Sequence, residues 1–282
     1  GAAALLEAAG HPVERIGVDR EGRLAPEDVC ARAHRSGAGL VSLMAANNEV
    51  GTVYPIGEVA ARLGTVPRAS RPLVFTDAVQ ALGRIPVALR AWNVDLAAFS
   101  AHKVGGPLGV GVLYRRLGVT LQPLASGGGQ EFGLRPGTEN VPAIAAAALA
   151  LELAVREQAA NAARWRALTR ELWQQLLAKV PDVRLNGPSI DADDRLPNTL
   201  NVHLPGFEAR MLVARLDLEG LAVSAGSACA SGSLEPSHVL LAMGRAHADA
   251  RAGVRLSLGH ATDSRDVHNA VEIVGRTLRS SR

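Results

Sequence analysis

In the first half of the chain, short apolar segments alternate with amphipathic ones. Apolar runs of strand length lie at Val13–Val18, Leu40–Ala45, Leu73–Phe75, Leu96–Phe99 and Val110–Tyr114. Helical spacing or helix-start signals predict helices at Leu5–Ala9, Pro26–His34 and Ile56–Leu63. Strands that alternate with helices are typical of an α/β domain with a mostly parallel sheet flanked by helices.

The second half has a different pattern. A long Ala-rich stretch, Val141–Val180, predicts helix, and its polar middle, Glu157–Arg166, favours a hinge between domains. Beyond Pro181 the elements are shorter: strands near Val183, Leu200, Val223 and Val254–Leu258, and helices at Glu208–Leu216, Ser237–Met243 and Ser264–Leu278. The pattern therefore predicts two domains, a large one over residues 1–157 and a smaller α+β one over residues 158–282.

Composition narrows the class of protein. The 282 residues are 48% hydrophobic and 20% charged with a net charge of +3, which excludes disorder as the main state. The basic residues are scattered among acids, so no nucleic-acid partner is expected, and no apolar run is long enough for a membrane span. With only Cys30 and Cys229, a disulfide framework is excluded and a reducing, cytoplasmic location is expected. The chain begins at Gly1 rather than Met, which indicates a piece of something longer.

Lysine is scarce in this chain. Of the 30 basic residues only Lys103 and Lys179 are lysines, so arginine has taken nearly every cationic position. A lysine amine can form a Schiff base, whereas an arginine stays protonated. Lys103 is therefore a candidate for covalent chemistry.

Three apolar strands end in polar side chains, which are Asn47-Asn48-Glu49, Thr76-Asp77 with Gln80, and Ser100 with His102 and Lys103. Ligands of an open α/β sheet collect at the carboxyl ends of its strands. Each group also has a plain structural interpretation: a turn at Asn47–Gly51, a turn cap at Asp77, and a loop into a strand after Lys103.

A rare lysine beside a strand-end carboxylate suggests pyridoxal phosphate. This cofactor needs an amine for its Schiff base and a carboxylate to keep its pyridine nitrogen protonated. Ser100 and His102 can donate to its phosphate. The glycines around Lys103 do not spell a dinucleotide fingerprint, and no cysteine or histidine pair has zinc spacing, so no metal site is expected.

The two cysteines differ in their surroundings. Cys229 lies in a run of small residues without periodicity, which predicts a mobile, exposed loop and a nucleophilic thiol. Cys30, on an amphipathic helix, is expected to be core or helix surface.

At these residues the chain resembles the NifS/IscS-like cysteine desulfurases, which belong to the class V aminotransferases with the type I pyridoxal phosphate fold. The resemblance is in MAANNEVGTVYPI, FTDAVQALGRIPV, DLAAFSAHKVGGPLGVGVLY, GGGQEFGLRPGTENV, SAGSACASGSLEPSHVLLAMG and VRLSLG, which span positions 44 to 259. It implies a homodimeric enzyme that converts L-cysteine to L-alanine. Sulfur would leave as a persulfide on Cys229 for an acceptor protein in iron–sulfur cluster or thio-cofactor and tRNA pathways.

The resemblance also implies residue roles. Lys103 would hold the cofactor and move protons, Asp77 would pair with the pyridine nitrogen, and Ser100 and His102 would hold the phosphate. Gln80 and Asn48 would hydrogen-bond the region of the ring oxygen and the substrate. Arg255 would bind the substrate carboxylate. Thr138 would reach the phosphate bound by the partner subunit.

The chain also departs from the family. The early phosphate loop is absent, the ring-stacking histidine would precede Gly1, and Phe75 stands where the family commonly has histidine. These departures predict that residues 1–282 alone do not make a working site. Two alternatives stay open: a selenocysteine lyase-type enzyme, and a catalytically incompetent fragment with a structural or interaction role.

Overall fold

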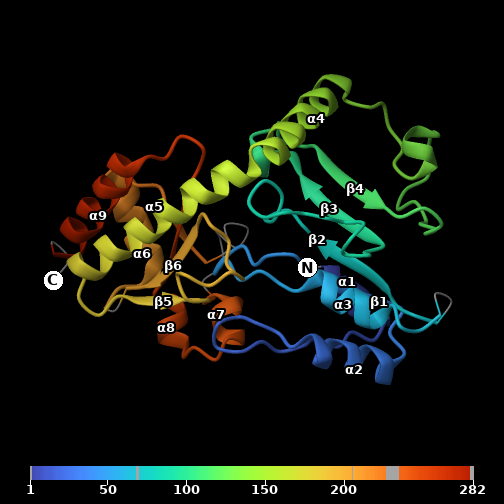
Figure 1. The fold of residues 1–282 in the computed structure, drawn as a ribbon, viewed down its shortest axis with the longest axis horizontal. Coiled ribbons are helices and arrows are strands. Elements are labelled where there is room, and N and C mark those ends of the chain that lie inside the picture. Colours follow the sequence, from blue (N-terminus) through green and yellow to red (C-terminus); the bar gives the residue numbers. More distant parts are fainter. Residues whose placement is uncertain (1, 68–69, 205, 227–234, 280–282) are drawn as a thin grey trace.

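The computed structural model describes residues 2–67, 70–204, 206–226 and 235–279. These residues form two four-stranded sheets, each with its own helices. Figure 1 shows the two sheets side by side, with the long helices α4 and α5 running from one to the other across the top.

The first sheet contains β1 (Leu40–Met44), β2 (Leu73–Asp77), β3 (Leu96–Ser100) and β4 (Gly111–Arg115), in that order. The first three strands are parallel, and β4 pairs antiparallel with β3. A parallel neighbour needs a crossover of a dozen or more residues, and the link from Ser100 to Gly111 is too short for one. The predicted α/β fold with a mostly parallel sheet is confirmed.

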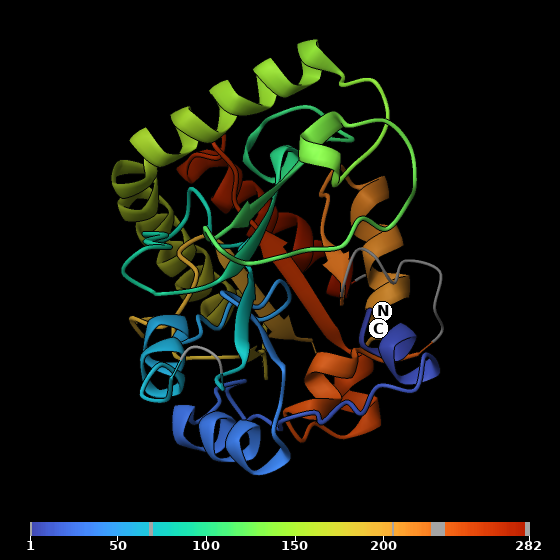
Figure 2. The ribbon, with the colours of Figure 1, turned by 90° about the vertical axis from the view of Figure 1, so that its right-hand side faces the viewer.

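Helices α2 (Pro26–Ser36) and α3 (Ile56–Leu63) pack together on this sheet. The buried positions of α3 are Ile56, Val59, Ala60 and Leu63, the spacing of one helical face. Cys30 of α2 lies in the same core at 7% exposure, so the prediction of a structural cysteine is confirmed. In Figure 2 these blue helices lie at the end of the molecule opposite α4.

Helix α4 (Val141–Arg156) contacts the short 3-10 helix η1 (Ala101–Val104), which contains Lys103. Two glycines permit this close approach. A Cβ on Gly106 would lie 3.1 Å from Ala150 Cβ, and one on Gly83 would lie 3.0 Å from Ala154 Cβ. Small residues on both sides thus allow α4 to pack closely against the segments that follow β2 and β3.

Helix α5 (Gln158–Lys179) follows α4 after a break at Glu157, the residue at which the sequence predicted a domain boundary. The second sheet is antiparallel, with strand order β5-β6-β8-β7. Its elements are β5 (Arg184–Asn186), β6 (Thr199–His203), β7 (Ser224–Ala225), β8 (Gly253–Ser257), α6 (Ala209–Leu218), α7 (His238–Ala242), α8 (His247–Arg251) and α9 (Ser264–Arg279). An apolar cluster fills the space between α5, α6, α9 and this sheet. The elements beyond Pro181 are thus an antiparallel sheet with helices, while the division into domains at residues 157 and 158 stays a prediction.

Some elements differ from the prediction. The segment Val13–Val18 forms no strand, because it pairs with no neighbouring strand among the described residues, and a strand needs such a ladder. Ile16 and Val18 instead pack against two different apolar clusters. Three short helices, α8, η1 and η2 (Gln130–Gly133), were not predicted, and α1 (Ala2–Ala8) buries none of its residues.

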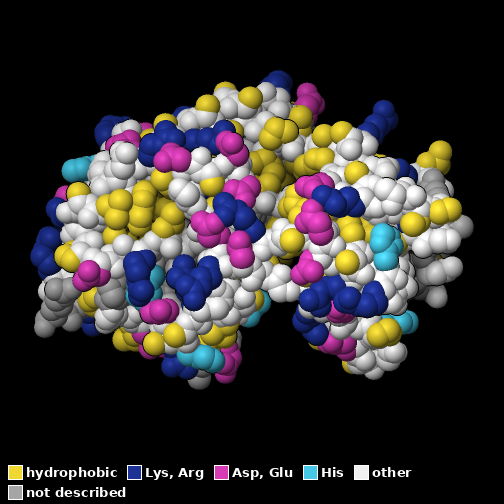
Figure 3. Space-filling model, turned by 60° about the horizontal axis from the view of Figure 1, so that its bottom comes forward, with side chains coloured by type: hydrophobic (Ala, Val, Ile, Leu, Met, Phe, Trp, Pro, Cys, Tyr) yellow, Lys and Arg dark blue, Asp and Glu magenta, His cyan; other side chains and the backbone are white. Residues whose placement is uncertain are grey.

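The surface is mixed in character. On the face drawn in Figure 3, basic and acidic side chains are interleaved, and a notch divides the face into two lobes. Among the described helices, none is long and apolar enough to cross a membrane.

Candidate active site

The carboxyl ends of β2 and β3 bring predicted site residues to one edge of the first sheet. Asp77 ends β2 and pairs with Ala98 of β3, and Ser100 ends β3 two residues later. His102 and Lys103 follow in η1. Parallel strands end at the same edge, so the sequence expectation that these side chains share an edge agrees with the geometry.

These side chains are accessible. His102, Lys103 and Asp77 are exposed, and Ser100 is half-buried. Among the described residues, none forms a hydrogen bond with the side chains of Ser100, His102 or Lys103. Asp77 Oδ1 accepts from Val79 N–H at 3.0 Å, the turn cap of the structural interpretation, and this contact also orients the carboxylate. The edge thus presents an amine, a hydroxyl and an imidazole that are available to a ligand.

Asn48 and Arg255 meet across 207 residues of sequence. The Arg255 guanidinium, on β8 of the second sheet, donates through Nη1 to Asn48 carbonyl oxygen at 2.6 Å. Its Nη2 donates to Ser224 Oγ at 3.2 Å, at the start of the small-residue run. Arg255 therefore links the loop after β1 to strand β7, and lies where both sheets meet.

The remaining predicted residues are placed differently. Gln80 is half-buried in the turn after β2, while Thr138 is exposed in the segment before α4. The side chain of Thr138 makes no hydrogen bond to another described residue. Cys229 lies outside the described residues. Asn47 has the turn role of its structural interpretation, since its Oδ1 accepts from the N–H groups of Glu49 and Val50.

Comparison with known proteins gives the family. The Aminotransferase class-V family model matches residues 2–269. The chain belongs to this family. It is 40% identical over 280 residues to a cysteine desulfurase IscS of Clostridium botulinum, covering 99% of this chain and 69% of that protein. A cysteine desulfurase of Cereibacter sphaeroides is 44% identical over 94% of this chain and 66% of its own length.

Solved class V structures are similar too. A NifS-like protein superposes with a TM-score of 0.87 at 36% identity, over 98% of this chain and 71% of that one. A NifS-like protein from Rickettsia africae gives a TM-score of 0.83 at 31% identity, over 94% and 69% of the two chains. The chain spans about 69% of the length of the curated class V relatives, and the prediction that residues 1–282 do not work alone stays a prediction.

Class V aminotransferases and their cysteine desulfurase group use pyridoxal phosphate. The donor set at the sheet edge fits this cofactor. It offers a lysine amine for the aldehyde, a carboxylate at Asp77 for the pyridine nitrogen, and Ser100 with His102 for the phosphate. The three unpartnered side chains are those the cofactor would need.

Two residues of this class V chain were given no role in the sequence analysis: Glu49, which was noted only as a polar residue after a strand, and Arg84, which was not noted. Glu49 is fully buried, and its Oε2 accepts from Ser237 Oγ at 2.5 Å. A Cβ on Gly226 would lie 3.6 Å from the same oxygen. Glu49 thus binds Ser237 and lies near Gly226, two residues that flank the segment outside the described residues. No local pattern marked this burial, since Glu58 also precedes a valine and is exposed.

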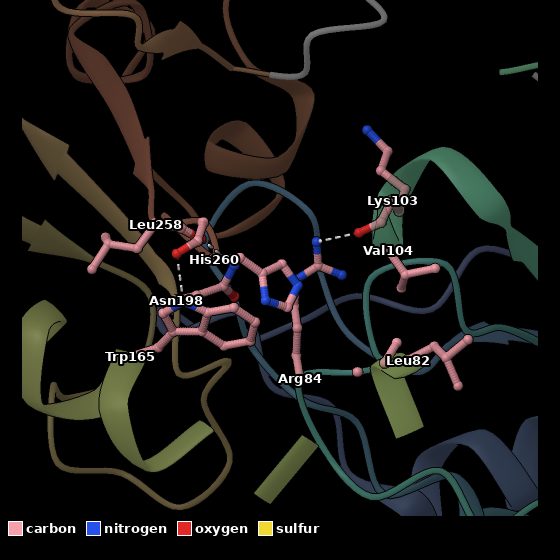
Figure 4. A pocket seen from close by; sticks show the side chains of 11 residues that line it. Leu82, Arg84, Lys103, Val104, Trp165, Asn198, Leu258 and His260 are labelled. Atoms are coloured by element: carbon pink, nitrogen blue, oxygen red, sulfur yellow. Dashed lines mark hydrogen bonds between the residues drawn. The ribbon is translucent and has the colours of Figure 1, made fainter. Parts of the chain in front are cut away.

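Arg84 is the second missed residue. Its guanidinium donates to Gln80 carbonyl oxygen at 3.2 Å and to Lys103 carbonyl oxygen at 3.1 Å, as drawn for Lys103 in Figure 4. Burial, and then the charge of Arg255, lowers the pKa of Arg84 to about 10, so it stays protonated near neutrality. The sequence signal for its partial burial was the apolar pair Leu82 and Ile85, which lie close to Arg84 along the chain.

Proposed function

We propose that this class V chain acts as a pyridoxal phosphate-dependent cysteine desulfurase, which converts L-cysteine to L-alanine and places the sulfur on Cys229. The observation that carries the proposal is the edge formed by Asp77, Ser100, His102 and Lys103, which the Asn48–Arg255 contact joins to the second sheet. A related solved structure, SspA in complex with cysteine, is 31% identical over 91% of this chain.

Lys103 would hold the cofactor, and its amine would then move a proton at the substrate. When bound, pyridoxal phosphate supplies an electron sink for the substrate carbon. Asp77 would keep the pyridine nitrogen protonated, and the Val79 N–H bond keeps the carboxylate in place for that role. Ser100, His102 and, from a partner subunit, Thr138 would bind the phosphate, while Gln80 would meet the ring oxygen.

Arg255 would orient the substrate by its carboxylate. A guanidinium matches a carboxylate with two parallel N–H bonds, and contacts to Asn48 and Ser224 fix its direction. Asn48 lies beside it and would contact the same substrate. The Cys229 thiolate would then attack the substrate sulfur, forming an S–S bond as the substrate C–S bond breaks.

The two cysteines provide the test. We expect Cys229→Ser to retain the cofactor and bind L-cysteine, but to release almost no alanine or sulfide. Cys30→Ser should change turnover little, because Cys30 is buried and burial raises the pKa of its thiol, which disfavours the reactive thiolate. Mass spectrometry should find the added sulfur on Cys229 of the wild-type chain. Equal loss in Cys30→Ser, or full turnover in Cys229→Ser, would overturn the assignment.

Three further features belong to the same proposal. The exposed apolar side chains Leu113, Phe132 and Val141 support a homodimer in which Thr138 completes the partner's site. A sulfur-acceptor protein would take the persulfide sulfur, in a cytoplasmic, reducing environment, for iron–sulfur cluster or thiolation pathways. Light scattering on the purified protein measures the dimer directly, and a monomer at all concentrations would contradict it.

A further inference from the structure

A half-open cavity of about 90 Å³ lies where the two sheets' domains meet. Arg84, Lys103 and Val104 line it from the first domain, and Trp165 and His260 line it from the second. Figure 4 shows the Lys103 side chain extending away from Arg84, so that the carbonyl oxygen of Lys103, and not its amine, faces the Arg84 guanidinium. The cavity is thus next to the candidate active site but separate from it.

The polar groups of this cavity are suited to a negative charge. No acidic side chain lines it, and no carboxylate of the described residues lies within ion-pair distance of Arg84. The guanidinium has five N–H groups, and its hydrogen bonds to the carbonyl oxygens of Gln80 and Lys103 engage one N–H of each terminal nitrogen. Arg84 is half-buried, and a partly desolvated cation without a counter-ion is unfavourable; the repulsion from Arg255 adds to that cost.

His260 forms the opposite wall. Its ring meets Trp165 edge-on at 5.3 Å between ring centroids, and the Trp165 indole N–H donates to Gly259 carbonyl oxygen at 2.9 Å. Among the described residues, none bonds to the ring nitrogens of His260. Trp165 therefore positions the His260 imidazole at the cavity wall, where a ring N–H can donate a hydrogen bond to a ligand.

We propose that this cavity is a binding site for a small oxyanion, a carboxylate or an inorganic anion of similar size, held by Arg84 and His260. The cavity volume is large enough for an anion of a few atoms but too small for a nucleotide or a peptide. The Arg84 bond to Lys103 carbonyl oxygen connects the anion to η1. Occupancy would thus steady the turn that presents the Lys103 amine. The inference rests on the cavity and its charges, and it does not require desulfurase activity.

Calorimetric titration tests the site on the purified chain. Acetate, L-alanine and sulfate would be titrated separately at constant ionic strength against the wild type. Arg84→Gln keeps hydrogen-bond donors but removes the charge, and it should weaken anion binding at least about tenfold. His260→Ala changes an exposed side chain, and it should weaken binding as well.

Arg195→Gln is the matched control. Arg195 is more deeply buried than Arg84, but it likewise donates to two carbonyl oxygens, burial likewise lowers its pKa to about 10, and it does not line the cavity. Binding should survive this change, with circular dichroism and the unfolding midpoint reporting the fold of every variant. If Arg84→Gln does not fold, the result with His260→Ala decides.

The three titrated anions distinguish an organic carboxylate from an inorganic oxyanion as the natural ligand. Binding of acetate and L-alanine would identify an amino-acid carboxylate, and binding of sulfate alone an inorganic oxyanion; both support the site. Absence of binding by all three anions would overturn the proposal. It would equally fail if binding persists in both cavity variants and is lost in Arg255→Gln, because the anion would then sit at Arg255.

Discussion

At the scale of single residues, the two lysines of this arginine-rich chain have different surroundings. Lys103 Nζ makes no hydrogen bond or ion pair with another described residue. Lys179 Nζ pairs with Glu272 at 2.7 Å, and a Cβ on Gly275 would lie 2.9 Å from the lysine Cγ. Rarity alone therefore does not mark a catalytic lysine; position at a strand end distinguishes Lys103 from Lys179.

This difference predicts opposite outcomes for the same substitution. Lys103→Arg should keep the charge but abolish covalent cofactor binding, because a guanidinium forms no Schiff base. The visible absorbance of the bound cofactor and its retention after borohydride reduction measure this. Lys179→Arg is the control, and it should retain both signals. A reduced, covalently attached cofactor in Lys103→Arg would refute the role of Lys103.

A second residue-scale prediction concerns the buried Glu49. Ser237 donates to it and also caps α7 by accepting from Leu240 N–H at 3.2 Å. Ser237→Ala should lower the free energy of unfolding by about 1–3 kcal/mol, because it leaves a buried carboxyl oxygen unpaired and removes the cap. Urea unfolding measures the loss. Ser36→Ala, which removes a hydroxyl from an exposed contact, serves for comparison and should cost less than Ser237→Ala.

At the scale of elements, α4 positions η1 through a close contact. A Cβ on Gly106 would lie 2.9 Å from Ala101 Cβ in η1 and 3.1 Å from Ala150 Cβ in α4, tighter than nearly all Cβ contacts. Ala101 is followed directly by His102 and Lys103. The spacing between α4 and the sheet edge thus depends on the absence of a side chain at Gly106.

We therefore expect Gly106→Ala to destabilise the chain by about 1–3 kcal/mol, as overpacking does, and to weaken cofactor affinity because η1 must move. Gly39→Ala is the matched control, since a Cβ there meets no atom within 4 Å. Thermal unfolding and cofactor titration measure the two effects. If Gly106→Ala and Gly39→Ala behave alike in both assays, the close contact does not position η1.

At the scale of the whole molecule, the sheet has a charged cluster at the end opposite the site. Asp95, just before β3, has a fully buried side chain that accepts two bonds from Arg71 and one from Val74 N–H. Burial would raise the pKa of Asp95, but these bonds and the charges of Arg71 and Arg116 outweigh it and lower that pKa. The cluster joins the starts of β2 and β3.

Removing this carboxylate should destabilise the whole chain. Asp95→Asn leaves a buried guanidinium without its partner and should cost about 3–5 kcal/mol near neutral pH. The difference in free energy of unfolding between variant and wild type should shrink as pH falls below about 4. The lowered pKa of Asp95 stabilises the folded chain fully at pH values above the pKa of the unfolded chain. This stabilisation is lost as pH falls through the pKa of the folded chain. Urea unfolding at several pH values measures this. Asp191→Asn breaks an exposed pair with Arg170 and should cost about 0–1 kcal/mol at every pH.

The assembled molecule also shows which parts of the prediction hold. Strands β1 to β4 and helix α3 were predicted within a residue or two, because their apolar runs are local. The short helix α8 was missed, since five residues carry too little periodicity. The segment Val13–Val18 was wrongly predicted as a strand, because strand formation depends on a neighbour that the sequence does not identify.

The sequence by itself determined the alternation of strands and helices, the family motifs, and the polar side chains that follow β1, β2 and β3. These follow from local pattern and residue chemistry. Only the tertiary structure decided that Arg255 reaches Asn48, that Glu49 is buried against Ser237, and that Arg84 lines a cavity with His260. Each of these contacts joins residues more than 150 positions apart. Local pattern carries no information about such distances, because the packing of two separate cores decides which distant surfaces meet.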